Sequence, residues 1–448
     1  MPATTIIRMY LVLTALYTLA ASLIWGVNTL FLMQKGGLDI FEVFVANAIF
    51  AAAMALFEVP TGLVADTRGR RLSFLLSLAI LLTGTLGYVG ATALGGGIVL
   101  FAAMSIVLGL GFTFYSGAME AWLVDALTAA GFTGALDGVL ARAAFTSGAA
   151  MLVGRVGGGL LGTIDLSIPY LVRALLLAGI LAIGFAGMRD LGFSPRPLGS
   201  HTLWVEMDSI ARASLRYGWR HPSVRLLIAA SAALALFTSW GFYAWPPYFL
   251  ALAGRDAPWI TGILAGAISA AAMAGSAVVA WLARSCSRRT TLLVWAVAIH
   301  AAAALGVGLV SPFWAAVLLY LLATAAMGMF QPVKQAYLHQ LIPSSQRATV
   351  VSFDSLISNG TSTAGQMALG YLARVESIAA GYVVGGALTF AALPVVALLR
   401  SRHEPADLIV GPAGTRSPCA AQGLPSVAAV DTGVPNGAPP PRPGVTTA

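Results

Sequence analysis

Long apolar runs separated by short polar segments dominate the chain from about residue 8 to residue 399. Each run supplies the roughly 20 mainly apolar residues that a helix needs to cross a bilayer. We therefore predict twelve membrane-spanning helices. Their ranges are 8–33, 41–64, 73–92, 97–124, 138–163, 167–188, 223–251, 258–283, 291–310, 313–340, 347–373 and 377–399.

The most polar internal stretch, residues 189–222, divides these runs into two sets of six. This predicts an all-α integral membrane protein with a six-helix N-terminal half over 1–188, a cytoplasmic linker over 189–222 and a six-helix C-terminal half over 223–400. The segment 401–448 holds nine of the 22 prolines. Because it cannot bury enough apolar surface to fold, we expect a disordered cytoplasmic tail.

Composition supports the membrane assignment, since only 9% of the residues are charged and 58% are hydrophobic, whereas soluble domains are about 25% charged. The net charge of +8 does not indicate a nucleic-acid partner, because the basic residues lie between apolar runs. With a cytoplasmic N-terminus, twenty of the 25 Lys and Arg residues fall on the cytoplasmic side and three fall outside. This bias predicts a multi-pass protein of the plasma (inner) membrane with both termini cytoplasmic.

The segment GLVADTRGRR, residues 62–71, concentrates charge between the second and third predicted spans. Asp66 and Arg70 are four residues apart, so they would pair on one face of a helix. A small residue at Gly62 would let another helix approach closely. The pattern of Gly62, Asp66, Gly69, Arg70 and Arg71 therefore indicates more than a marker of membrane topology, although topology alone is the alternative.

Twelve spans in two halves with this loop resemble the major facilitator superfamily of secondary transporters over about residues 5–400. Thr67 departs from the family pattern, in which an arginine is usual. The resemblance implies a central cavity, alternating access and a cytoplasmic latch that favours the outward-open state. It also implies that Asp125, at the cytoplasmic end of span four, pairs with Arg70, and we assign Glu58 to the same latch.

If the two halves are repeats, the loop between spans eight and nine should carry the same device. That loop reads RSCSRRTT over residues 284–291. Its arginines remain, but the glycine and the aspartate of the first loop are gone. We expect a repeat that is visible in hydropathy and degenerate in sequence.

Charged residues inside predicted spans are costly, and they usually face a cavity or a partner. Glu120 in span four is our first candidate for a proton carrier, and Asp354 in span eleven is the second. The alternative for each is a permanently paired structural charge. Lys334 in span ten is a candidate partner within the C-terminal half.

Span five reads AMLVGRVGGGLLG and presents small residues at every fourth position, which favours close helix packing. Antiporters of the superfamily carry a similar glycine-rich stretch, but Arg155 stands where they have proline. If Arg155 is buried, we expect a carboxylate partner, Glu120 or Glu58. The remaining cavity candidates are Asn28, Trp240, Tyr243, Gln331 and Asn359.

The chain has no His/Cys/Asp/Glu cluster with metal-ligand spacing, no nucleophile elbow and no phosphate-binding Gly-Lys-Ser/Thr loop. We therefore expect no metal, no enzymatic activity and no cofactor beyond a proton gradient. The resemblance to prokaryotic drug and tetracycline-type efflux members implies proton-coupled export of a small amphipathic compound by a monomer in the lipid bilayer. A metabolite or sugar uptake carrier is the alternative, and a non-transporter membrane protein is less favoured.

Overall fold

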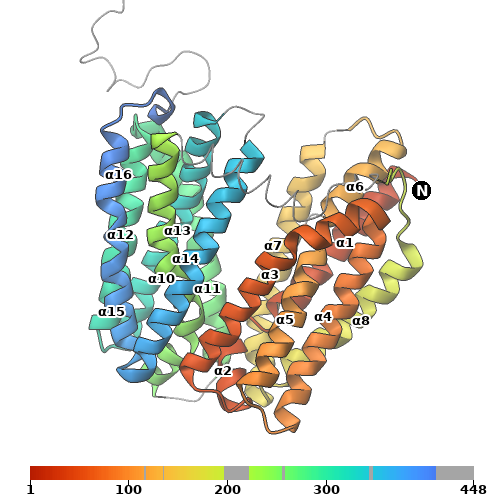
Figure 1. Cartoon of the computed structure of the whole chain (residues 1–448), viewed down its shortest axis with the longest axis horizontal. Helices are drawn as coiled ribbons and strands as arrows, with labels where there is room; N and C mark the ends of the chain where they lie inside the picture. The colour runs from red at the N-terminus through yellow and green to blue at the C-terminus, as the bar shows by residue number, and fades with distance from the viewer. Residues whose placement is uncertain (116–117, 135, 196–220, 255–257, 343–346, 410–448) are drawn as a thin grey trace, which may run out of the picture. The chain divides into compact units, whose positions relative to one another are not determined.

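The computed structural model describes residues 1–115, 118–134, 136–195, 221–254, 258–342 and 347–409 (Figure 1). Most of the predicted linker and tail, and Cys419, lie outside the described residues. The helices are α1 (Ala3–Ser22), α2 (Asn28–Gln34), α3 (Ile40–Arg68), α4 (Arg70–Ala93), α5 (Ile98–Tyr115), α6 (Ala118–Ala129), α7 (Leu136–Ile164), α8 (Ile168–Gly187), α10 (Pro222–Ala253), α11 (Pro258–Ser285), α12 (Arg289–Leu309), α13 (Phe313–Leu341), α14 (Arg347–Val375), α15 (Ile378–Thr389) and α16 (Ala392–Arg400).

These helices reproduce the twelve predicted spans, and the fold is an all-α membrane fold. Within the described residues, eleven helical segments are long and apolar enough to cross a membrane. Helix α14 is not among them, because polar and charged residues lower its hydropathy. It has 29 residues, which is long enough to span a bilayer. It packs against α10, α3 and α15, and its polar residues Asp354, Ser362 and Gln366 are buried.

The first predicted span is not one continuous helix. Helix α1 ends at Ser22, and α2 begins at Asn28 after a turn closed by short-range hydrogen bonds such as Val27 N to Ile24 O at 3.1 Å. Hydropathy could not reveal this break, because the turn itself is apolar. Broken helices occur at membrane depth where backbone lines a cavity or is covered by protein, which makes the 23–27 turn a feature of interest.

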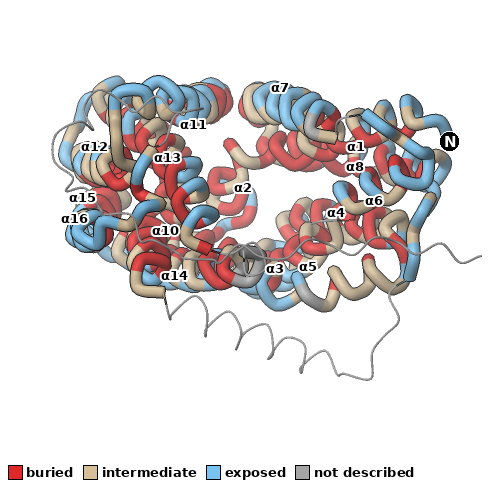
Figure 2. The backbone as a smooth tube through the Cα atoms, turned by 90° about the horizontal axis from the view of Figure 1, so that it is seen from above, coloured by how far each residue is buried: buried red, intermediate tan, exposed pale blue. Residues whose placement is uncertain are grey.

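Each half has its own hydrophobic core, the N-terminal half around α1, α4 and α8 and the C-terminal half around α10, α12 and α13. Helix α7 is among the least buried helices (Figure 2). Large apolar side chains such as Phe145 and Val153 lie on its exposed surface. Exposed apolar side chains of this kind would be costly in water, but they are suited to contact with lipid tails.

The contacts between the two halves gather toward one side of the bundle. We call the side with the connections 35–39 and 165–167 the distal side, and the side with the N-terminus and Gly69 the proximal side. Phe44 of α3 stacks on Trp240 of α10, with ring centroids 5.8 Å apart. Gly159 of α7 lies against the backbone of Gly262 of α11, so neither position has room for a side chain.

Three glycines of α3, α7 and α14 nearer the proximal side have no such neighbours. A Cβ added at Gly62 of α3, Gly148 of α7 or Gly360 of α14 would meet nothing within 4 Å. The close approach that we predicted at Gly62 is therefore absent in this conformation. The two halves are packed together on the distal side and leave space around these glycines on the proximal side.

The chain continues as ordered structure beyond the predicted start of the tail. Residues 405–407 form a 3-10 helix, Asp407 is buried, and Ile409 N donates to Ser287 O at 3.0 Å. The prediction of disorder from Ser401 onward is thus wrong for residues 401–409. That prediction rested on composition, which cannot reveal that a single buried residue such as Asp407 holds the segment in place. Residues 410–448 lie outside the described part of the chain.

Candidate functional site: a cavity between the halves

A cavity of about 290 Å³ lies where the two halves meet. The 23–27 turn, α3, α4, α5 and α8 form most of its wall, and α10 of the C-terminal half closes it. The wall is rich in aromatic rings, with a few polar groups among them. The lining residues are Ile24, Trp25, Asn28, Asn47, Phe50, Met54, Tyr88, Leu108, Phe112, Arg173, Phe242 and Tyr243.

Two of the predicted cavity residues, Asn28 and Tyr243, do line this cavity. Asn28 begins α2, directly after the break in the first span, and its side-chain oxygen accepts a hydrogen bond from the Tyr170 hydroxyl at 2.8 Å. The backbone oxygen of Tyr243 accepts a hydrogen bond from Thr29 Oγ1 at 2.8 Å. This bond joins α2 to α10, so the wall of the cavity is also a junction between the halves.

Arg173 of α8 is the one charged residue among those that line the cavity. The residue is only 1% exposed, and its guanidinium lies 5.8 Å from the centre of the Phe112 ring. Its Nε has no hydrogen-bond partner in the described structure, and no carboxylate there pairs with it. Arg173 lies inside the predicted span 167–188, where a charge usually faces a cavity or a partner, but it was not among the predicted cavity residues.

Arg155 of α7 lies behind the cavity wall, with its guanidinium 5.0 Å from the centre of the Trp25 ring. It donates hydrogen bonds to Ser269 Oγ and, at 3.5 Å, to Ala265 O, both on α11. The carboxylate partner that we expected for it is absent from the described residues. That expectation was wrong because a hydroxyl, a carbonyl and an indole face surround this arginine instead.

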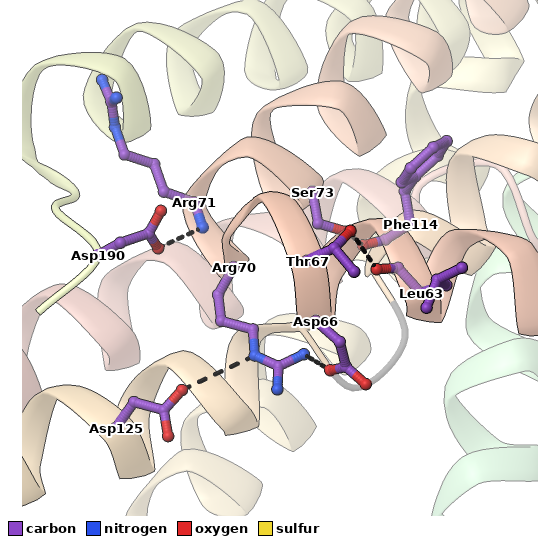
Figure 3. Close-up of polar contacts among 9 residues, drawn as sticks. All are labelled: Leu63, Asp66, Thr67, Arg70, Arg71, Ser73, Phe114, Asp125 and Asp190. Carbon is purple, nitrogen blue, oxygen red and sulfur yellow. Dashed lines mark hydrogen bonds and ion pairs between the residues drawn. The ribbon is translucent and has the colours of Figure 1, made fainter. Parts of the chain in front are cut away.

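On the proximal side, Arg70 lies close to both predicted partners, Asp66 from the spacing and Asp125 from the family resemblance (Figure 3). Arg70 pairs with Asp66, one helical turn away, and its Nε lies 3.7 Å from Asp125 Oδ2 on α6. Thr67, the departure from the family pattern, donates to its own helix at Leu63 O. All of these contacts lie within the N-terminal half, so in this conformation they do not join the two halves.

Asp190, which the sequence analysis did not single out, anchors the same loop. Its Oδ1 accepts a hydrogen bond from the backbone N of Arg71 at 2.8 Å, at the first turn of α4 (Figure 3). Gly69, with φ +111°, connects α3 to α4, and the Asp190 carboxylate occupies the space where a Cβ would stand. Gly69 is therefore needed both for its backbone conformation and for this close approach.

The second half contains an equivalent aspartate contact that could not be predicted from its loop sequence. Asp407 accepts hydrogen bonds from Thr290 N at 2.7 Å and Thr290 Oγ1 at 2.8 Å, at the first turn of α12. Arg289 donates to the backbone oxygens of Ala406 and Leu408. The aspartate that RSCSRRTT lacks is supplied by residues after the last helix, so the repeat is conserved in geometry more than in loop sequence.

The two proton-carrier candidates lie in different surroundings. Asp354 of α14 is buried, and its Oδ2 lies 2.6 Å from Lys334 Nζ of α13. Its other oxygen has no hydrogen-bond partner in the described structure. Glu120, in the first turn of α6, is exposed. Glu120 lies within the candidate span Ile98–Ala129, as predicted, but its side chain lacks the burial that Asp354 has in this conformation.

The remaining predicted residues lie outside the cavity wall. Trp240 is fully buried in the aromatic cluster that packs α3 against α10. Gln331, Asn359 and Glu58 are exposed, on α13, α14 and α3 respectively. The described residues contain no group of three His, Cys, Asp or Glu side chains that could hold a metal ion.

Comparison with known proteins gives a family match over part of the chain. Residues 260–428 match the model of the Major Facilitator Superfamily. No curated protein matches the sequence.

Solved structures match over most of the chain. The nucleoside transporter NupG gives a TM-score of 0.73 at 11% identity, covering 88% of this chain and 99% of that one. A bacterial homolog of the human lysosomal transporter Spinster, in an inward-facing and occupied conformation, gives 0.70 at 13% identity, covering 92% and 99%. A POT family transporter in complex with a thioalcohol-conjugated peptide gives 0.66 at 12% identity, covering 88% and 96%.

Proposed function

Because the chain has the fold of the major facilitator transporters, and because its C-terminal half matches that family, we propose that it is a secondary active transporter that works by alternating access. The family and the fold are those of transporters rather than enzymes. The observation that carries the proposal is the cavity between the halves, because both halves contribute to its wall. A site at the junction of two repeats becomes accessible from one side or the other as the halves move.

In this proposal the proximal side is cytoplasmic, in line with the distribution of the basic residues, and the conformation is inward-open. The packed distal contacts around Phe44, Trp240 and Gly159 then form the outer closure. The open space at Gly62, Gly148 and Gly360 is where the inner closure forms in the opposite state. The loop around Arg70 acts as the latch of that state, already shaped by its pairs within the N-terminal half.

We further propose that transport is coupled to protons and that Asp354 carries the proton. Burial supports Asp354 over Glu120. A buried carboxylate depends on its partner for charge compensation, so binding a proton strongly changes its interaction with that partner. Protonation of Asp354 would break its ion pair with Lys334 and change how α13 and α14 interact. Export of a small amphipathic compound remains our proposed direction, with a monomer and no cofactor other than the proton gradient.

The test is proton flux in liposomes that contain the purified protein and a dye for lumenal pH. An imposed gradient of substrate should drive proton movement in the wild type and in Glu120→Gln, and this movement should be lost in Asp354→Asn. Opposite fluxes of proton and substrate indicate export by antiport, whereas parallel fluxes indicate uptake by symport. Flux that survives Asp354→Asn but not Glu120→Gln would return the carrier role to Glu120.

A further inference from the structure

The cavity combines an aromatic wall with a cationic group that has no counter-charge. Arg173 lines the cavity, is almost fully buried, and has no carboxylate partner among the described residues. None of the lining residues is acidic. A buried charge is energetically costly unless an opposite charge compensates it. A buried arginine that lines a cavity is therefore suited to a ligand that carries a negative charge.

The tyrosines that interact with Arg173 cannot supply that charge themselves. Tyr17, Tyr88 and Tyr170 interact electrostatically with it, and phenols are neutral near physiological pH. Two of them are already engaged, Tyr88 with Ser105 at 2.7 Å and Tyr170 with Asn28 at 2.8 Å. The face of Phe112 attracts the guanidinium but leaves its in-plane N–H groups free to bind.

Arg155 adds a second positive charge to the same region. Its guanidinium lies against the ring of Trp25, which lines the cavity, and its hydrogen-bond partners are neutral groups. Tyr243 of α10 lines the cavity and carries a hydroxyl that can donate a hydrogen bond. The cavity thus offers a cationic group from one half and a hydrogen-bond donor from the other. The electrostatic potential between its aromatic walls is positive.

We infer that the substrate is an organic anion with an apolar or aromatic body, whose acidic group binds Arg173. A planar guanidinium binds a carboxylate or a phosphate through two parallel hydrogen bonds. The rings of Phe50, Phe112 and Phe242 would hold the apolar body. This inference rests on the proposed transport function, and it turns the expected substrate class away from lipophilic cations.

The test is equilibrium binding to the full-length protein in detergent, measured by titration calorimetry and by the shift in thermal unfolding temperature. The probes share one ring system: naphthoate and naphthyl phosphate as anions, naphthalenemethanol as the neutral analogue, and naphthylmethylammonium as the cation. At least one anion should bind more tightly than the neutral and cationic probes. Arg173→Gln should weaken that binding by roughly tenfold or more, and Arg173→Lys should restore part of it.

Arg8→Gln, which removes an exposed arginine of α1, is the matched control and should bind as the wild type does. Tyr243→Phe should weaken anion binding by a smaller factor than Arg173→Gln. Preferred binding of the cation, equal binding by the wild type and Arg173→Gln, or no anion bound by the wild type would each overturn the inference. Because binding in detergent needs no proton gradient, anion binding without proton-linked flux would remove the proposed coupling and keep this result.

Discussion

Asp190 and Asp407 make the same contact in the two halves of the chain. Each follows the sixth helical span of its half, and each accepts a hydrogen bond from the second backbone N–H of the third span, from Arg71 in α4 and from Thr290 in α12. The sequence separation is also nearly equal, 119 residues in the first half and 117 in the second. In each half, the aspartate therefore attaches the segment that follows the sixth span to the start of the third span.

We predict that removing either contact destabilises its own half, since a lost helix cap costs about 0.5–2 kcal/mol. Asp407→Ala should cost more than Asp190→Ala, because Asp407 is buried and also accepts from Thr290 Oγ1. Thermal unfolding of the purified protein measures both. Glu376→Ala, which removes an exposed carboxylate at the end of α14, is the control. Equal stability of Asp407→Ala and this control would contradict the capping role.

Alanine at Gly69 and at Gly62 should have opposite effects. Gly69→Ala meets both a positive φ and the Asp190 carboxylate, so we expect a loss of roughly 1–3 kcal/mol. Gly62→Ala adds a methyl group to open space inside a helix, so we expect up to about 1 kcal/mol of gain. If the inner closure forms at Gly62, this more stable variant should nevertheless transport more slowly. Unchanged transport would place the closure elsewhere.

The distal ion pair between Arg374 of α14 and Asp39, the N-cap residue of α3, should favour the conformation described here. Arg374 Nε lies 3.3 Å from Asp39 Oδ2, and both side chains are partly exposed. A surface pair contributes about 0.2–1 kcal/mol, so Arg374→Gln should raise the population open on the distal side by at most about fivefold.

The reporter for that shift is a cysteine at Thr29, which is buried between α2 and α10, in a background with both native cysteines changed to serine. An impermeant maleimide added from the distal side should label it faster in Arg374→Gln. Glu376→Gln, two residues away on the chain, should label at the original rate. Slower labelling in Arg374→Gln would mean that the pair favours the opposite state.

Acidification should remove a small contribution to folding stability that ionised Asp165 makes in the distal loop between α7 and α8. The hydrogen bond from Lys35, at 2.6 Å, together with one from Ser167 N, holds the pKa of Asp165 below its usual value of 3.8. A carboxylate whose pKa is lower in the folded state than in the unfolded state stabilises the fold at pH values above its unfolded-state pKa. That contribution is lost as the pH falls through its folded-state pKa. Because the pair is exposed, we expect no more than about 1 kcal/mol.

The measurement is the difference in unfolding free energy between the wild type and Asp165→Asn as a function of pH. The difference should be constant near neutral pH and should shrink below about pH 4. A difference that grows on acidification would show that the carboxylate is destabilising in its ionised form.

Much of the fold could be predicted from hydropathy alone, because a bilayer imposes both the length and the composition of each span. The positions of α3, α8 and α12 follow from their apolar runs and from the arginines between the spans. The Arg70 contacts were also foreseeable, since Asp66 lies one turn away and the family resemblance pointed to Asp125.

Other features depend on tertiary contacts that no local pattern encodes. The break between α1 and α2 lies within an apolar run, and Arg173 is a cavity residue only because α8 faces α5 across the bundle. Asp407 was assigned to a tail because its neighbours in sequence are polar and proline-rich. Its partner Thr290 is 117 residues away, a distance that composition cannot bridge.

The contact at Asp407 also sets an order of events during synthesis. The first half holds its aspartate before any residue of α10 has been made, whereas α12 must enter the membrane and wait until the final helix has followed it. A chain cut just after Arg400 would contain every described transmembrane helix and still leave the start of α12 without its carboxylate. Truncations and fusion tags placed between 401 and 409 should therefore impair biogenesis, while the same changes made after Ile409 leave this step intact.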